Sequence, residues 1–333
     1  MAVFRKYVAA LRQPNLRSRL QLLRDLQTGL RLQFLYFVID AGLLRALPAT
    51  RDELVERLRV QRSDILDAAL AMGVALKELS LRNGRYAVRG ARSRLLLSAD
   101  GDMIAGTIQE YVAYHSSVYH ELTARLRGAP PGDYLERFGT VITRSSRVLE
   151  PFIADFVKDN MKSGPVRLLE IGCGTGVYLH HAARANPQVT GVALDLQEGV
   201  IEQARTNLRQ WGILDRFQLL AGDVRHPPEA AAGPFDVITL HNNVYYFEPE
   251  ERQALFRRLR AALTPGGALL LTTLMRGSSV ASLDFDLALR CTAGCTPLPS
   301  IDEVTAQLKE GGFSDVRATR LMPMEPLYGL TAR

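Results

Sequence analysis

The sequence predicts an α/β protein. Its C-terminal half is expected to form a parallel sheet covered by helices, and its N-terminal part is expected to be mainly helical. From about residue 163 onward, short apolar runs alternate with helical stretches, which is the pattern of a parallel sheet. Earlier in the chain, a long helical stripe is followed by two short helices and a hairpin. The 333 residues are enough for two ordinary domains. We predict an N-terminal domain over 1–102, a helical linker over 103–162 and a ligand-binding domain over 163–333.

The first predicted helix lies within residues 15–43. Apolar residues recur there at helical spacing, with arginines between them, at positions 16, 20, 23, 26, 30, 34, 37 and 38. Such a basic amphipathic helix can lie on a membrane surface. We favour packing against a partner subunit or against the protein's own core.

Two short helices and a hairpin are predicted next. Thr50-Arg-Asp-Glu53 is a capping box that opens the first helix, and Ser63 is expected to cap the second. Asn83-Gly84 suits the two-residue turn of a hairpin. Helix, helix, hairpin is a winged-helix pattern, but the only charges on the second helix are Asp64 and Asp67. A DNA reader needs basic and polar side chains on that helix, so we predict a scaffold.

Aromatic and imidazole groups are concentrated in the linker. On an α-helix, Tyr111, His115 and Tyr119 stand at i, i+4 and i+8 and therefore share one face. This face is expected to form one wall of a substrate pocket. The alternative is ordinary packing between domains, for which tyrosines and histidines are well suited.

The ligand-binding domain opens with a glycine-rich loop. Residues 167–176 are predicted to be a buried strand that runs into this loop, and a helix follows from Val177 to Ala185. Glycines leave room for a ligand against the main chain, and the N-terminus of the helix favours a polar ligand group. Asp195 ends the next apolar run, 19 residues after Gly176. An acidic side chain at this position is placed to bind ribose hydroxyls.

The loop carries a family resemblance. Glu170-Ile-Gly-Cys-Gly-Thr-Gly176 resembles the E/D-x-G-x-G-x-G loop of class I S-adenosylmethionine-dependent methyltransferases. A dinucleotide-binding loop would need a glycine where Val177 stands. A Pro-Gly-Gly turn at 265–267, before an apolar strand, is a second feature of that family. The resemblance implies a Rossmann-like methyltransferase domain with S-adenosylmethionine as cofactor.

The N-terminal layout resembles the winged-helix dimerisation domain of small-molecule O-methyltransferases of secondary metabolism. This resemblance implies a homodimer, a small-molecule acceptor and methyl transfer to oxygen. It also implies that the cofactor is bound by the glycine loop, by residues after the second and third strands, and by residues after the fourth strand. The matching positions are Glu170, Gly172, Cys173, Gly174, Thr175, Gly176, Asp195, Leu196, Asp223, Val224, His241 and Asn242.

The chain departs from this family at the catalytic base. The O-methyltransferases carry a His-Asp pair after the fourth strand, and Tyr245 and Tyr246 stand at those positions. A neutral tyrosine, with a pKa of about 10, is a poor base. Three accounts stay open: His241, His115 or His120 replaces the base, the acceptor is acidic enough to need none, or the acceptor atom is an amine nitrogen or an activated carbon.

The candidate catalytic residues are therefore His241, Tyr245 and His115. The candidate substrate contacts are Tyr111, His115, Tyr119, Asn243 and Tyr246. Two rival functions remain: a donor-binding protein that catalyses a reaction other than methylation, and a winged-helix regulator.

Composition narrows the class of protein. The chain is 47% hydrophobic and 23% charged, with a net charge of +6 and no long Lys/Arg run. It has no apolar run of about 18 residues, the length that a membrane span needs. Three cysteines give no disulfide framework, and Cys291 and Cys295 have no second ligand pair for a metal nearby. We expect a cytoplasmic enzyme without metal, membrane or nucleic-acid partner.

Overall fold

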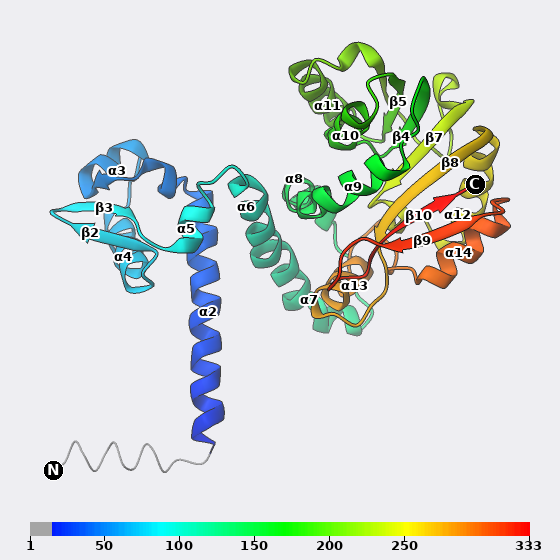
Figure 1. Ribbon diagram of the computed structural model, residues 1–333. Coiled ribbons are helices and arrows are strands. Elements are labelled where there is room, and N and C mark those ends of the chain that lie inside the picture. Colours follow the sequence, from blue (N-terminus) through cyan, green and yellow to red (C-terminus); the bar gives the residue numbers. More distant parts are fainter. Residues whose placement is uncertain (1–14) are drawn as a thin grey trace, which may run out of the picture. The chain divides into compact units, whose positions relative to one another are not determined.

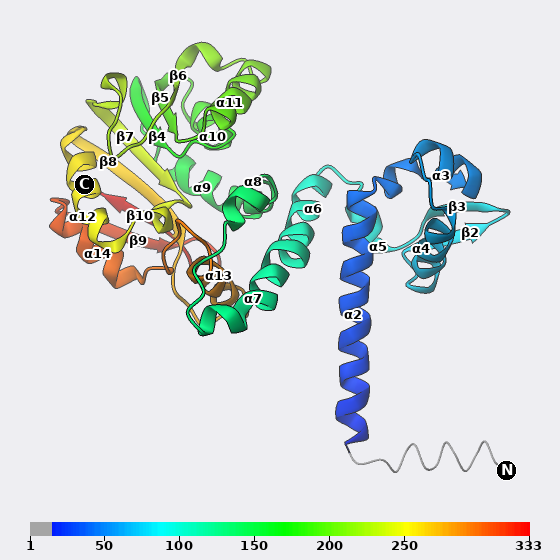
Figure 2. The ribbon, with the colours of Figure 1, turned by 180° about the vertical axis from the view of Figure 1, so that it is seen from behind.

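The computed structural model describes residues 15–333, which form two compact units (Figures 1 and 2). The N-terminal unit contains the described residues up to Ser117 together with Thr140–Ser146. The C-terminal unit contains Val118–Gly139 and Arg147–Arg333. The predicted linker 103–162 is thus divided between the two units. Within residues 15–333, no helix is both long enough and apolar enough to span a bilayer.

The N-terminal unit has the predicted order of helix, helix and hairpin. Its elements are α2 (Leu16–Asp40), the 3₁₀-helix Leu43–Ala46, β1 (Ala49–Thr50), α3 (Arg51–Arg57), α4 (Ser63–Ala75), β2 (Leu79–Arg82), β3 (Arg85–Val88), α5 (Ala91–Leu95), α6 (Gly101–Gln109) and the π-helix Glu110–His115. The capping box of Thr50 and Glu53 is confirmed. Asn83 and Gly84 form the hairpin turn, with φ of 49° and 74°. The expected cap at Ser63 is wrong, because Ser63 is already helical and Arg62 precedes it without a side-chain cap.

Helix α2 is buried only at its C-terminal end. Phe34, Leu35 and Val38 pack into the apolar core of the unit, beside Leu66 and Leu70 of α4. The leucines nearer its N-terminus are between 41% and 60% exposed: Leu20, Leu22, Leu23, Leu26, Leu30 and Leu32. The apolar stripe that predicted this helix is therefore only partly covered by the described residues of the chain.

The C-terminal unit is built on a seven-stranded sheet, and this confirms the predicted α/β class. Its strands are β4 (Val166–Ile171), β5 (Val189–Asp195), β6 (Phe217–Ala221), β7 (Phe235–His241), β8 (Leu263–Leu274), β9 (Val316–Arg320) and β10 (Leu327–Ala332). Their order is β6-β5-β4-β7-β8-β10-β9, and β10 runs antiparallel to both of its neighbours. Because the first five strands are parallel, their carboxyl ends lie along one edge of the sheet.

Helices cover both faces of this sheet (Figure 1). The helices of the unit are α7 (Ser116–Leu126), which begins in the N-terminal unit, α8 (Tyr134–Ser145), which crosses between the units, α9 (Glu150–Asn160), α10 (Val177–Ala185), α11 (Glu198–Gln210), α12 (Pro249–Ala261), α13 (Val280–Arg290) and α14 (Ile301–Glu310). One core lies between the sheet and α9, α10 and α11. The other lies between the sheet and α12 and α14. Both faces are covered, which explains why β4 and β7 are buried at every position except Arg167 and Asp236.

Candidate active site

The glycine loop follows β4 at the carboxyl edge of the sheet. Gly172 and Gly174 have φ of 66° and 54°, in the left-handed region that favours glycine. A Cβ at Gly172 would lie 2.4 Å from Nδ2 of Asn243, so this position has no space for a side chain. A Cβ at Gly174 would meet no atom within 4 Å. The main chain at Gly174 thus borders open space, where a ligand can approach it.

Asp195 at the end of β5 holds the loop in place. The amides of Gly172 and Cys173 donate to the carbonyl oxygen of Leu194, at 2.7 and 3.1 Å. The amide of Gly174 donates to Oδ2 of Asp195 at 3.0 Å, and Oδ1 accepts from the amide of Gln197 at 3.1 Å. The sequence predicted Asp195 as a ligand of ribose, and its hydrogen bond to the loop itself was not predicted.

Glu170, the last but one residue of β4, is a buried carboxyl group. It is 1% exposed, and neither carboxyl oxygen has a hydrogen-bond partner among residues 15–333. Burial, with a smaller contribution from the charge of Asp195, raises its pKa to about 8. Such an orphaned acceptor beside the glycine loop suits a ligand that brings a hydrogen-bond donor or a positive charge.

The other residues of the loop are placed by packing and main-chain contacts. Cys173 is 3% exposed, and burial raises the pKa of its thiol well above the ordinary value, so it stays protonated. The carbonyl oxygen of Thr175 accepts from Nδ2 of Asn207 on α11 at 3.0 Å. A Cβ at Gly176 would lie 2.4 Å from Leu208 of the same helix. Helix α11 therefore fixes the far end of the loop.

The residues expected to bind the cofactor after the second and third strands differ in exposure. Leu196 is 66% exposed, whereas Val224 is buried. β6 ends at Ala221, so Asp223 lies beyond the strand rather than at its end. Its carboxylate forms an ion pair with Arg225 at 2.9 Å, and it also accepts from the amide of that residue at 2.8 Å. Sequence reasoning did not anticipate that Arg225 would hold this carboxylate.

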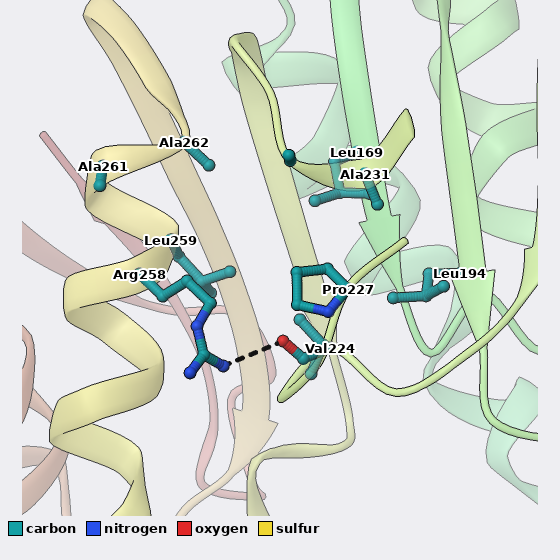
Figure 3. Close-up of a pocket in the computed structure, with 10 residues that line it drawn as sticks. Leu169, Leu194, Val224, Pro227, Ala231, Arg258, Leu259, Ala261 and Ala262 are labelled. Atoms are coloured by element: carbon teal, nitrogen blue, oxygen red, sulfur yellow. Dashed lines mark hydrogen bonds between the residues drawn. The ribbon is translucent and has the colours of Figure 1, made fainter. Parts of the chain in front are cut away.

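Val224 also borders a cavity of about 190 Å³ in the sheet face toward α12 (Figure 3). The lining is apolar except for one arginine, and consists of Leu169, Leu194, Val224, Pro227, Ala231, Ala232, Arg258, Leu259, Ala261 and Ala262. Nη1 of Arg258 donates to the carbonyl oxygen of Val224 at 3.2 Å. The lining extends from Leu194 and Val224, near the carboxyl ends of β5 and β6, to Ala262, beside the start of β8.

His241 ends β7 and is nearly inaccessible. Its Nδ1 lies 2.8 Å from Oγ1 of Thr272, and its ring packs against Tyr178 with centroids 4.7 Å apart. Nε2 has no partner among the described residues. Burial lowers the pKa of His241 to about 3, so the imidazole is neutral at physiological pH. A group with so low a pKa is a weak general base, but it can still form a hydrogen bond through Nε2.

The two asparagines after β7 turn the chain back toward the glycine loop. Asn242 has a φ of 53°, and its amide donates to the carbonyl oxygen of Thr272 at 2.7 Å. Asn243 is 8% exposed, and its Nδ2 donates to the carbonyl oxygen of Ile171 at 2.7 Å. Its Oδ1 has no partner within residues 15–333. Asn243 was predicted as a substrate contact, and the structure places it directly against the predicted donor loop.

Tyr245 and Tyr246, at the positions of the family's His-Asp pair, form an aromatic group. The ring of Tyr245 meets that of Tyr246 at 4.8 Å and that of Phe285 on α13 at 5.5 Å, in both cases edge to face. Tyr245 is buried, whereas Tyr246 is 38% exposed. These side chains offer an apolar surface beside the turn that carries Asn243.

The linker residues do not behave as one α-helical face. Residues 110–115 form a π-helix, so the α-helical spacing assumed for Tyr111, His115 and Tyr119 does not apply. Tyr111 and His115 are in ring contact at 4.7 Å, and His115 is buried. Tyr119, on α7, donates instead to Oδ1 of Asp284 on α13 at 2.8 Å. His120, next along α7, is exposed.

Comparison with known proteins gives a consistent picture. A family model described as a methyltransferase domain matches residues 168–267. The N,N-dimethyltransferase OxyT of Streptomyces rimosus is 26% identical, over 86% of this chain and 88% of that protein. The 3-hydroxy-5-methyl-1-naphthoate 3-O-methyltransferase of Streptomyces sahachiroi is 25% identical, over 90% of this chain and 91% of that protein.

Solved structures share the fold over nearly the whole chain. The mitomycin 7-O-methyltransferase MmcR superposes with a TM-score of 0.78 at 20% identity, covering 95% of this chain and 98% of that one. The pyocyanin biosynthetic protein PhzM gives a TM-score of 0.67 at 20% identity, covering 96% and 100%. The matched domain contains the glycine loop and the strands that support it. Residues 168–267 therefore form a methyltransferase domain, and the chain is an S-adenosylmethionine-dependent methyltransferase.

Proposed function

We propose that this enzyme methylates a small molecule of secondary metabolism, with oxygen as the favoured acceptor atom. The observation that carries the proposal is the glycine loop, tied to Asp195 and open at Gly174. Relatives that align with most of the chain support the acceptor class, because they include the naphthoate 3-O-methyltransferase and a demethylspheroidene O-methyltransferase from Cereibacter sphaeroides.

The residues around the loop fit the methyl donor. We assign Asp195 to the ribose hydroxyls, and Leu196, Asp223 and Val224 to the adenine ring. Three buried polar groups without partners among the described residues suit the methionine end: the carboxyl of Glu170, Nε2 of His241 and Oδ1 of Asn243. When bound, S-adenosylmethionine supplies an electrophilic methyl group on a sulfonium that is a good leaving group. The protein's main task is then to position the acceptor and to exclude water.

The acceptor side is assigned to Tyr246 and to the neighbouring Tyr245. His241 is a weak candidate for the base because of its low pKa. His115 and His120 remain alternatives, and an acceptor with an acidic hydroxyl needs no base at all. Methylation of nitrogen is the second candidate. It is favoured by the similarity to OxyT, which is named an N,N-dimethyltransferase, and by the tyrosines in place of the His-Asp pair.

A homodimer is also part of the proposal. Helix α2 exposes Leu23, Leu26 and Leu30 at helical spacing, in a row that the described residues leave uncovered. The same stripe on a second copy of the chain is the natural partner, since isologous contact covers both rows at once. We also propose a cytoplasmic location, which is supported by the three free thiols.

The test combines donor binding with the identity of the product. Calorimetry with S-adenosylmethionine and S-adenosylhomocysteine establishes the donor site. The enzyme is then offered 3-hydroxy-2-naphthoate and 3-amino-2-naphthoate, which differ only in the acceptor atom, and the products are identified by mass spectrometry. Methylation of the hydroxyl alone supports the leading proposal, and methylation of the amine supports the second candidate. Tight donor binding without methylation of these or related aromatic acceptors would favour a reaction other than methylation.

A further inference from the structure

Arg252 is a buried arginine inside α12. It is 2% exposed, whereas Arg257 and Arg258 of the same helix are exposed. Its Nε donates to the carbonyl oxygen of Phe247 at 3.0 Å, and its Nη2 donates to Oγ1 of Thr296 at 2.6 Å. Burying a guanidinium is costly unless its hydrogen bonds are satisfied, so its partners indicate what the arginine supports.

Thr296 extends this contact to the turn after β7. Its Oγ1 accepts from Arg252 and donates to the carbonyl oxygen of Tyr245 at 3.1 Å. Its amide donates to the same carbonyl oxygen at 2.8 Å. The side chains of Arg252 and Thr296, with the carbonyl groups of Tyr245 and Phe247, are called the Arg252 brace below.

The turn that the Arg252 brace holds is in contact with the glycine loop at its first residue, Asn243. Residues 244–246 form a single 3₁₀ turn, and Asn243 precedes it. Asn243 donates to the carbonyl oxygen of Ile171 and packs against Gly172 so closely that no Cβ would fit there. A continuous path of hydrogen bonds and chain therefore runs from Arg252 through the turn to the glycine loop.

We propose that Arg252 and Thr296 are positioning residues: they hold the 243–247 turn against the glycine loop and so set the affinity for the methyl donor. The inference rests on the donor site assigned above. The brace also fixes the main chain of Tyr245, and through it the place of the two tyrosines beside the acceptor. A guanidinium suits this role because Nε and Nη2, two separate donors of one planar group, reach acceptors on two different segments.

If the Arg252 brace positions the turn, its removal should lower the affinity for the methyl donor as well as the stability of the protein. The variants are Arg252→Met, which removes the guanidinium, Thr296→Val, which removes the hydroxyl at equal size, and Thr296→Ser, which keeps it. Arg216→Met is the matched control. Arg216 also donates to two carbonyl groups, of Val189 at 3.1 Å and Asn186 at 2.9 Å. These contacts lie at the amino ends of β5 and β6, whereas the glycine loop lies at the carboxyl ends of the strands.

The affinity for S-adenosylhomocysteine is measured by calorimetry at a temperature at which every variant is folded, and Tm is measured in parallel. We expect Arg252→Met and Thr296→Val to weaken binding by about 2- to 30-fold. Thr296→Ser should bind like wild type, and Arg216→Met should lower Tm without a change in affinity. Hydrogen exchange at residues 243–247 should accelerate in the first two variants only.

Two results would overturn the proposal. One is unchanged donor affinity in Arg252→Met and Thr296→Val despite a lower Tm, which would make the brace purely structural. The other is an equal loss of affinity in Arg216→Met, which would make the effect non-specific. Failure of the wild-type protein to bind S-adenosylhomocysteine is a separate result, because it would contradict the donor site itself.

Discussion

The backbone amide of Gly174 and the carboxylate of Asp195 are joined by a hydrogen bond of 3.0 Å across the ends of β4 and β5. The same carboxylate is the group assigned to the ribose of the donor. Asp195 therefore shapes the loop, and in the function proposed above it also binds the ligand that the loop receives.

Replacement of Asp195 by alanine should weaken donor binding through both tasks. Because hydrogen bonds to a charged group are among the stronger ones, we expect a loss of about 10-fold or more in affinity for S-adenosylhomocysteine. Asp195→Asn keeps an acceptor for the Gly174 amide and should lose less. Calorimetric titration of the three proteins decides. Equal affinity of Asp195→Ala and wild type would remove Asp195 from the site.

Glu170 should make the stability of the ligand-free protein depend on pH. Its pKa rises from 4.5 to about 8 on folding, so between these values the folded state holds a proton that the unfolded state has lost. The free energy of unfolding should therefore fall as pH rises through this window, by up to about 5 kcal/mol in total.

Glu170→Gln, which stays neutral, should lack this component. Urea unfolding of both proteins at several pH values across the window provides the measurement. Parallel curves for the two proteins would show that Glu170 is ionised in the folded state.

His241 should not titrate in the physiological range. Its pKa is lowered to about 3 by burial, so the folded protein keeps it neutral while the unfolded chain takes up a proton below 6.5. Stability contributed by the neutral form is thus complete above 6.5 and is lost as pH falls toward 3. Imidazole ¹⁵N chemical shifts, assigned with a His241→Gln variant, should stay constant at physiological pH and down to about 5. A midpoint near 6.5 would return His241 to the list of candidate bases.

The leucine row on α2 should control the oligomeric state. Lysines at Leu23 and Leu26 place charge in the proposed interface and should convert the dimer into a monomer. Leu81→Lys is the control, because Leu81 is comparably exposed, at 49%, but lies in the hairpin. Sedimentation velocity reports the mass in solution. A dimer that survives the double substitution would exclude this face as the interface.

Much of the fold follows from local features of the sequence. The predicted helix Val177–Ala185 has the observed bounds, and the strand that ends at Asp195 lies where its apolar run predicts. Glycines at turns and unbroken apolar runs can both be recognised from neighbouring residues alone, so they predict loops and strands without knowledge of the fold. Two local predictions were wrong. Residues 110–115 form a π-helix rather than an α-helix, and the cap of α4 is Arg62 rather than Ser63.

The sequence by itself determined the order of strands and helices, the glycine loop and the acidic residue that follows it, because each depends on contacts between near neighbours in the chain. Only the tertiary structure decided the state of Glu170 and His241, since their pKa values depend on burial by distant segments. It also joined Asn243 to Ile171, 72 residues earlier, and Arg252 to Thr296, 44 residues later. No local pattern encodes such pairs, because a hydrogen bond needs only that folding bring two atoms within reach.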